Sequence, residues 1–179
     1  MKIYSFLIMI SLLSYFNFLN ASDYEEKQLV GAVFSEVISN MEEKYHMQCF
    51  ASGGAMMDSI KSLKLSFDLY RPIQVDEARE ILVDLTEIFL NAVNQKVKIH
   101  PYLANYPFLP ENLNILICFS NLDGSIIVSP EISSISLVHG EVLYKVRGLE
   151  SSYGRIKTKV EPYAEAKKIV QQRSGSYEE

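Results

Sequence analysis

Residues 63–94 read LKLSFDLYRPIQVDEAREILVDLTEIFLNAVN, and this stretch decides the fold. Up to Tyr70 apolar and polar residues alternate, which predicts a half-buried strand. After Pro72 the apolar period changes to about 3.6 residues, which predicts an amphipathic helix. The residues on its apolar face are Val75, Ala78, Ile81, Leu82, Leu85, Ile88, Phe89, Ala92 and Val93. We expect this strand and this helix to cover each other.

The N-terminus has the layout of a secretory signal peptide. Lys2 precedes an apolar run over residues 3–19, and Asn20 and Ala21 follow it. We predict cleavage after Ala21 and export to the periplasm or the medium. In the alternative, the segment stays uncleaved and tethers the protein, although its length is at the lower edge for spanning a membrane. Residues 22–173 then form one domain, and residues 174–179 a disordered tail.

The remaining segments extend the pattern on both sides of the central stretch. Ser22 and Glu25 have capping-box spacing, which predicts a helix from Ser22 to about Tyr45. After it we expect a short extended segment that breaks at Gly53 and Gly54. Glu161 and Pro162 are expected to open a last helix.

Between these helices the sequence predicts strands joined as hairpins. The alternating or apolar runs are residues 113–119, 125–129, 132–138 and 141–147, and a tight turn is expected at His139 and Gly140. Residues 148–159 read as a polar connection, with or without a short extended piece. The expected fold is α+β, with a mainly antiparallel sheet of about four to five strands packed by two long helices and a C-terminal helix.

The composition argues against several classes of function. The net charge is −5 and the basic residues are scattered, so neither nucleic acid nor an anionic membrane surface is an expected partner. Beyond the N-terminal segment, no apolar run approaches the length of a membrane span. Cys49 and Cys118 are the two cysteines. An exported chain can pair them in a disulfide, but each also suits a small buried apolar position, and the sequence leaves both readings open.

Signatures of catalysis are missing from the sequence. His46, His100 and His139 lack the short paired spacings of metal-binding helices. There is no G-x-S-x-G nucleophile elbow and no phosphate-binding loop. The sequence therefore predicts no catalytic residue, no metal and no cofactor, and it favours a protein that is not an enzyme.

Two segments could instead form a contact surface. The loop over residues 96–112 carries Tyr102, Tyr106 and Phe108 among three prolines, and rigid aromatic side chains are typical of binding surfaces. Upstream, Gly53 and Gly54 precede Met56 and Met57, which suit an adaptable apolar contact. In the structural alternative, the loop folds over the end of the sheet and the methionines fill gaps in the core.

Four short stretches carry a resemblance to a known family. These are Gly53-Gly54-Ala55-Met56-Met57-Asp58, Asp76-Glu77-Ala78-Arg79, Pro101-Tyr102-Leu103-Ala104-Asn105-Tyr106-Pro107-Phe108 and Glu161-Pro162-Tyr163. Together they resemble a family of small exported bacterial proteins of unknown function. The resemblance implies a single exported domain and brings no activity.

The sequence thus favours an exported binding or interaction module, with another protein of the cell envelope as its partner. A pocket for a small apolar ligand between helix and sheet is the first alternative, and a hydrolase with a spatially assembled site is the second. The oligomeric state is not indicated.

Overall fold

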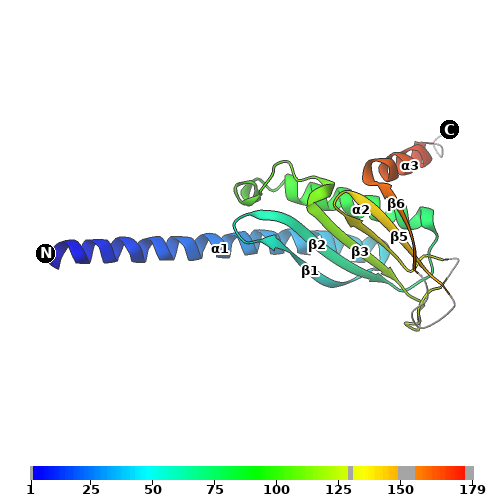
Figure 1. Ribbon diagram of the computed structural model, residues 1–179, viewed down its shortest axis with the longest axis horizontal. Helices are drawn as coiled ribbons and strands as arrows, with labels where there is room; N and C mark the ends of the chain where they lie inside the picture. The colour runs from blue at the N-terminus through cyan, green and yellow to red at the C-terminus, as the bar shows by residue number, and fades with distance from the viewer. Residues whose placement is uncertain (1, 129–130, 149–155, 176–179) are drawn as a thin grey trace.

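One six-stranded sheet with helices on a single side forms the body of the protein (Figure 1). The computed structural model describes residues 2–128, 131–148 and 156–175, with side chains described over residues 24–128, 131–148 and 158–173. The three α-helices are α1 (Lys2–Tyr45), α2 (Val75–Asn94) and α3 (Tyr163–Gly175). Two short 3₁₀-helices, η1 (Val97–Tyr102) and η2 (Pro110–Asn112), lie in the loop after α2.

The strands follow one another across the sheet in the order in which they occur in the chain. They are β1 (Gln48–Met56), β2 (Ile60–Leu69), β3 (Leu113–Phe119), β4 (Ser134–Val138), β5 (Glu141–Arg147) and β6 (Ile156–Pro162). All neighbours are antiparallel except β2 and β3, which run parallel with Leu63 beside Leu113. Because parallel neighbours need a long crossover, α2 spans the sheet between them.

The predicted α+β class is confirmed, but the predicted sheet was too small and too uniform. The sheet is mixed and has six strands, where four to five mainly antiparallel strands were expected. The strand–helix–strand order around α2 produces the parallel pair, since a helix that covers one face returns the chain in its original direction.

Three local predictions were also wrong. Gly53 and Gly54 lie inside β1 rather than at a break, and a Cβ on Gly54 would come within 2.4 Å of the Ser62 carbonyl oxygen. The expected hairpin partner at residues 125–129 is absent up to Val128, where only one bridge joins Ser120 to Ile126. At the C-terminus, Glu161 and Pro162 end β6 instead of opening the helix.

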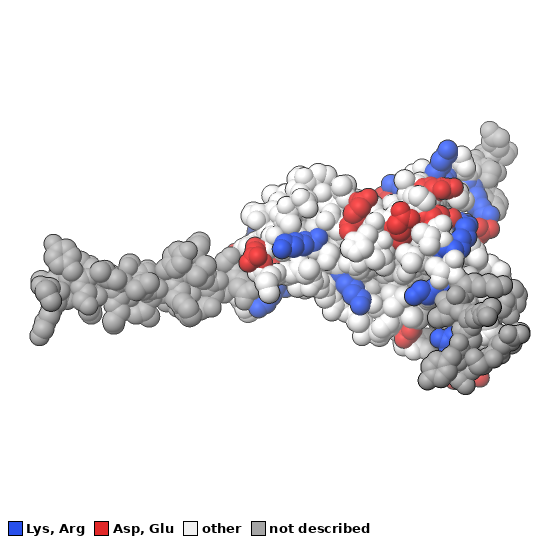
Figure 2. Space-filling model, viewed as in Figure 1, with Lys and Arg blue, Asp and Glu red and all other residues white. Residues whose placement is uncertain are grey.

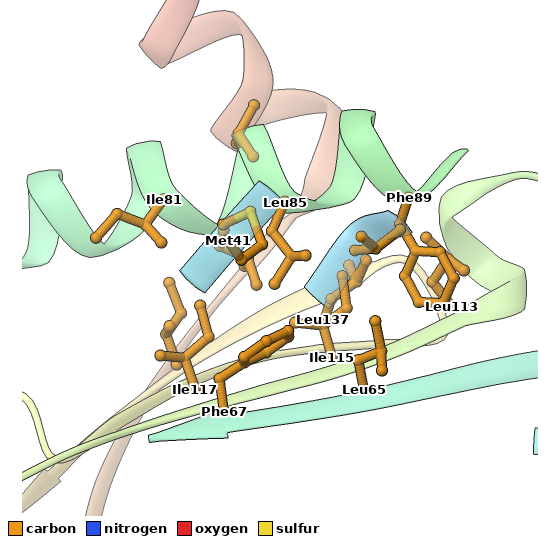
Figure 3. Close-up of a cluster of buried hydrophobic side chains, with 14 of the residues drawn as sticks. Met41, Leu65, Phe67, Ile81, Leu85, Phe89, Leu113, Ile115, Ile117 and Leu137 are labelled. Atoms are coloured by element: carbon orange, nitrogen blue, oxygen red, sulfur yellow. The ribbon is translucent and has the colours of Figure 1, made fainter. Parts of the chain in front are cut away.

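The core lies between the sheet and two helices. Side chains from β2 to β5 meet the apolar faces of α1 and α2, as Figure 3 shows for Phe67, Leu85 and Phe89. These three side chains are fully buried. The alternation in β2 and the 3.6-residue period in α2 therefore have the roles that the sequence predicted. No helix of the described residues lies on the opposite face of the sheet (Figure 1).

The turn between β4 and β5 is as predicted. Val138 pairs with Glu141, so His139 and Gly140 form a two-residue turn. Both have positive φ angles, 50° and 77°, which a type I′ hairpin requires.

The first helix does not break at Ala21. It continues through the predicted cleavage position, and α1 projects from one end of the domain (Figure 1). Among the residues that the structure describes, no helix is both long and apolar enough to cross a membrane. Of the predicted tail, residues 176–179 lie outside the described residues, whereas 174 and 175 belong to α3.

Candidate functional site

The two segments predicted to form a contact surface meet at one end of the molecule. Ile60, at the start of β2, forms a bridge with Leu103, and its carbonyl oxygen accepts a hydrogen bond from the Ala104 amide at 3.0 Å. This places the β1–β2 turn beside the loop after α2. Both lie at the end of the domain from which α1 projects (Figure 1).

Large apolar side chains are exposed on these two segments. We call them the tip residues: Met57, Val97, Tyr106 and Leu109. Met57 is 94% exposed and Tyr106 is 59% exposed, although single exposed apolar residues are common on any protein surface. What distinguishes the tip residues is that they come from two adjoining segments.

The loop is held by contacts with the end of α2. The Asn94 side chain forms two hydrogen bonds with the Phe108 backbone, accepting from its amide at 2.7 Å and donating to its carbonyl at 2.9 Å. The His100 ring lies 2.8 Å from the Asn94 backbone carbonyl oxygen and packs at a tilt of 39° against the Tyr106 ring, with a centroid separation of 4.1 Å. These contacts fix Tyr106 in an exposed position, so little conformational entropy remains to be lost on binding.

The other predicted binding residues contribute to the fold and present no large exposed apolar side chain. Phe108 is 1% exposed and belongs to the core. Tyr102 is half-buried, and its hydroxyl donates to Glu25 on α1 at 3.3 Å. Met56 is partly buried at the end of β1, and Gly53 and Gly54 are strand residues. Of the seven predicted residues, Tyr106 and Met57 are thus the two with large exposed apolar side chains.

A second cluster, which the sequence did not predict, is a buried charge network between α2 and the β5–β6 edge. The Arg79 Nε donates to Glu161 Oε1 at 2.7 Å, and the Tyr144 hydroxyl donates to the same oxygen. The side chains of Arg79 and Glu161 are 5% and 7% exposed. The Arg79 guanidinium also lies over the Tyr144 ring, 5.5 Å from its centroid.

Burial and pairing have opposite effects on the charges in this network. Burial disfavours the charged form of Glu161, but hydrogen bonds from Arg79, Tyr144 and Lys159 outweigh it and hold the pKa of this carboxyl below its usual range. Burial and the hydrogen bond to Glu161 both raise the pKa of Tyr144. At neutral pH the pair is therefore ionised and the phenol is protonated.

The network extends outward and fastens α3. Asp76 bonds Arg79 at 2.6 Å and Arg173 of α3 at 2.5 Å. Nearer the start of α3, a second carboxylate, Glu87 of α2, accepts from the Tyr163 hydroxyl at 2.7 Å and from Lys167 at 2.8 Å. Ion pairs and hydrogen bonds therefore join the last strand and helix to α2, in addition to the burial of Tyr163 and Ala166 in the core.

This network has the features of a structural element that joins α2 to β6 and α3, and it lacks those of a catalytic site. The Glu161 oxygens are engaged by Arg79, Tyr144 and Lys159, so none is left to act as a base, and the group is buried away from any substrate. The sequence did contain a signal. Arg79 lies at the border of the apolar stripe of α2, where a charged side chain must either reach solvent or find a buried partner.

The histidines and cysteines do not assemble into a site. His46 and His139 are exposed, whereas His100 is tied to the loop. In the part of the chain that the structure describes, no group of three His, Cys, Asp or Glu side chains could hold a metal ion.

The two cysteines are free thiols and point to opposite faces of the sheet. Cys49 pairs with Phe67 on the helix-covered face, whereas Cys118 pairs with Asp68 on the open face. Strand β2 separates them, so their Cα atoms are roughly 10 Å apart, too far for a disulfide. The bridge that the sequence left open is absent from this structure. Burial raises the pKa of both thiols, which keeps them protonated.

Comparison of the chain with protein-family models, curated proteins and solved structures finds no match. Its function must therefore be inferred from its own geometry.

Proposed function

We propose that the protein is a non-enzymatic binding module that is exported to the cell envelope and recognises another envelope protein through the tip residues. The observation that carries this proposal is the meeting of the β1–β2 turn and the loop after α2, which presents Met57 and Tyr106 together with Val97 and Leu109. Aromatic residues and methionine are enriched at protein interfaces, and a fixed Tyr is a typical anchor.

The position of the tip agrees with either fate of the N-terminal segment. If cleavage occurs after Ala21, the tip is free in the periplasm or the medium. If the segment stays attached, α1 tethers the domain and holds the tip towards the membrane that contains the segment. In both cases the tip is available to a neighbouring protein.

The helix–sheet pocket receives less support than the tip. The space between the sheet and helices α1 and α2 is filled by one cluster of buried side chains, including Met41, Phe67 and Phe89 (Figure 3). A ligand there would have to displace close-packed core residues. The hydrolase receives no support from the clusters described above.

The test is crosslinking and co-purification of the full chain, tagged at its C-terminus, from intact cells that export it. The variant Met57→Ser/Tyr106→Ser changes two exposed side chains, and Leu122→Ser is a matched control because Leu122 is 90% exposed in a different loop. We expect one specific crosslinked protein to be recovered with the unmodified chain and with the control, and to be lost with the double variant.

Circular dichroism should show that all three proteins are equally folded. Equal recovery with the double variant would contradict the tip as the binding surface. Association of the tip with protein-free phospholipid vesicles, lost in the double variant, would contradict a protein partner.

A further inference from the structure

The open face of the sheet contains a hollow of about 320 Å³. Its lining residues come from four strands and are Lys64, Asn114, Ile115, Leu116, Ser136, Val138 and Lys145. This hollow lies on the side opposite to α1 and α2, away from the core, and it shares no residue with the tip. It is comparable in size to the smaller ligand pockets of proteins.

Strand register explains why these side chains face the same way. Lys64 pairs with Asn114, and Leu116 pairs with Ser136, so each pair projects to one face of the sheet. The odd-numbered neighbours, such as Leu65 and Ile115, project to the core. Alternation that buries one set of residues thus necessarily places a lysine, an amide, a hydroxyl and a leucine around the hollow.

The two lysines of the hollow form no ion pair among the described side chains. Neither Lys64 nor Lys145 has a carboxylate oxygen within 4.0 Å. On the helix side, by contrast, Lys44 and Lys167 are both paired, at 2.8 Å. In Figure 2, acidic and basic side chains lie close together over α2 and α3.

The two ends of the hollow differ. Each end has a carboxylate in its row of the open face, Asp68 beyond Ser134 and Cys118 from Lys145, and Glu141 beyond Val138 from Lys64. At the Lys64 end, however, the ammonium group is accompanied by the Asn114 amide on the neighbouring strand, which can donate two further hydrogen bonds. These adjacent donors make the Lys64 end the better place for an anion.

An unused hydroxyl lies next to this end. Ser66 follows Lys64 on the same face of β2 and pairs with Leu116, which lines the hollow. Its side chain is 1% exposed, and its Oγ is the one buried side-chain N or O atom that makes no hydrogen bond among the described residues. Buried hydroxyls usually have a partner, so this orphan marks an unusual position on the face of the sheet that carries the hollow.

We propose that this hollow binds a small amphipathic carboxylate. The carboxylate is held by Lys64 and Asn114, and the apolar part of the ligand lies on Leu116 and Val138. A carboxylate fits better than a phosphate, because a phosphate needs several convergent donors. Here the second lysine is at the other end, and the backbone N–H groups are used in the sheet. The proposal concerns a different face from the tip, so either can fail without the other.

The test is calorimetric titration of the full chain, held in phospholipid nanodiscs, with octanoate, after subtraction of empty discs. Octanamide is the uncharged probe of the same length. Lys64→Met removes the proposed carboxylate ligand, and Lys61→Met is a matched control on the same strand whose side chain does not line the hollow. We expect saturable octanoate binding that weakens at least tenfold in Lys64→Met and changes less than twofold in Lys61→Met.

A second readout uses the cysteine on the open face. In a Cys49→Ser background, octanoate should slow modification of Cys118 by a maleimide, because Cys118 is two residues from Leu116 on the same face. Equal affinities for octanoate and octanamide, an unchanged affinity in Lys64→Met, or tighter binding of octyl phosphate than of octanoate would each overturn the proposal.

Discussion

Replacing Arg79 with Met should strongly destabilise the protein, although it removes a charge and adds apolar character. The substitution leaves Glu161, 7% exposed, without the guanidinium that lies 2.7 Å from its Oε1. Breaking a buried ion pair from one side typically costs about 3–5 kcal/mol. Here Lys159, 3.2 Å from Oε2, and the Tyr144 hydroxyl stay in place, so we expect the lower end, about 3 kcal/mol.

The double variant Arg79→Met/Glu161→Met distinguishes two contributions to the free energy of unfolding: the stability that the ion pair itself provides, and the cost of leaving one buried charge without its partner. It removes both buried charges and leaves side chains that can pack against the Tyr144 ring. Such replacements are often neutral or stabilising, so the double variant should recover most of the stability lost by Arg79→Met. The Tyr144 hydroxyl, which loses its acceptor, should keep the recovery incomplete by about 1 kcal/mol.

Urea unfolding followed by far-ultraviolet circular dichroism at pH 7 measures these differences. Asp76→Asn is a useful control, because its carboxylate is half exposed and exposed pairs contribute about 1 kcal/mol or less. A loss below about 1 kcal/mol in Arg79→Met, or a double variant no more stable than that single variant, would refute the role of the network as a buried tie.

Three further predictions follow from the same structure. Gly54→Ala should cost about 1–3 kcal/mol, because its Cβ would meet the Ser62 carbonyl oxygen at 2.4 Å. Gly53→Ala, with nothing within 4 Å, should change stability by less than about 0.5 kcal/mol, and equal losses in urea titrations would argue against the register of β1. Phe89→Ala should cost about 3–5 kcal/mol in the same assay, and a loss below about 1 would show that its ring is not core. Because the pKa of Glu161 is lowered on folding, its ionised form stabilises the protein above the unfolded pKa of about 4.3, and this stability is lost as the pH falls through the lower folded pKa. The urea concentration at the unfolding midpoint should therefore fall as the pH is lowered below about 4, and it should fall less steeply in Glu161→Gln. Equal pH dependence of the midpoint in the two proteins would count against the ion pair.

Local sequence predicted two of the four tip residues, Met57 and Tyr106, but it did not predict how the tip is assembled. The density of prolines and aromatics marked the loop after α2, and the methionines marked the end of β1. The bridge between Ile60 and Leu103 brings them together, and these residues are more than forty positions apart. Nor could local sequence tell that Phe108 is buried while Tyr106 is exposed, because this depends on how Asn94 holds the loop.

The sequence by itself determined a strand over residues 63–69, the helix that follows it and the α+β class. These depend on local periodicity, because the 2-residue or 3.6-residue repeat sets the face on which a side chain lies. Only the tertiary structure decided the parallel pairing of β2 with β3, the sixth strand and the partnership of Arg79 with Glu161. Strand pairing and buried ion pairs join residues far apart in the chain. Alternation in a strand is the same whether its neighbour is parallel or antiparallel, and a lone arginine at the edge of an apolar stripe does not name its partner. Strand pairing and the partners of buried charges are therefore fixed only by the packing of the complete core.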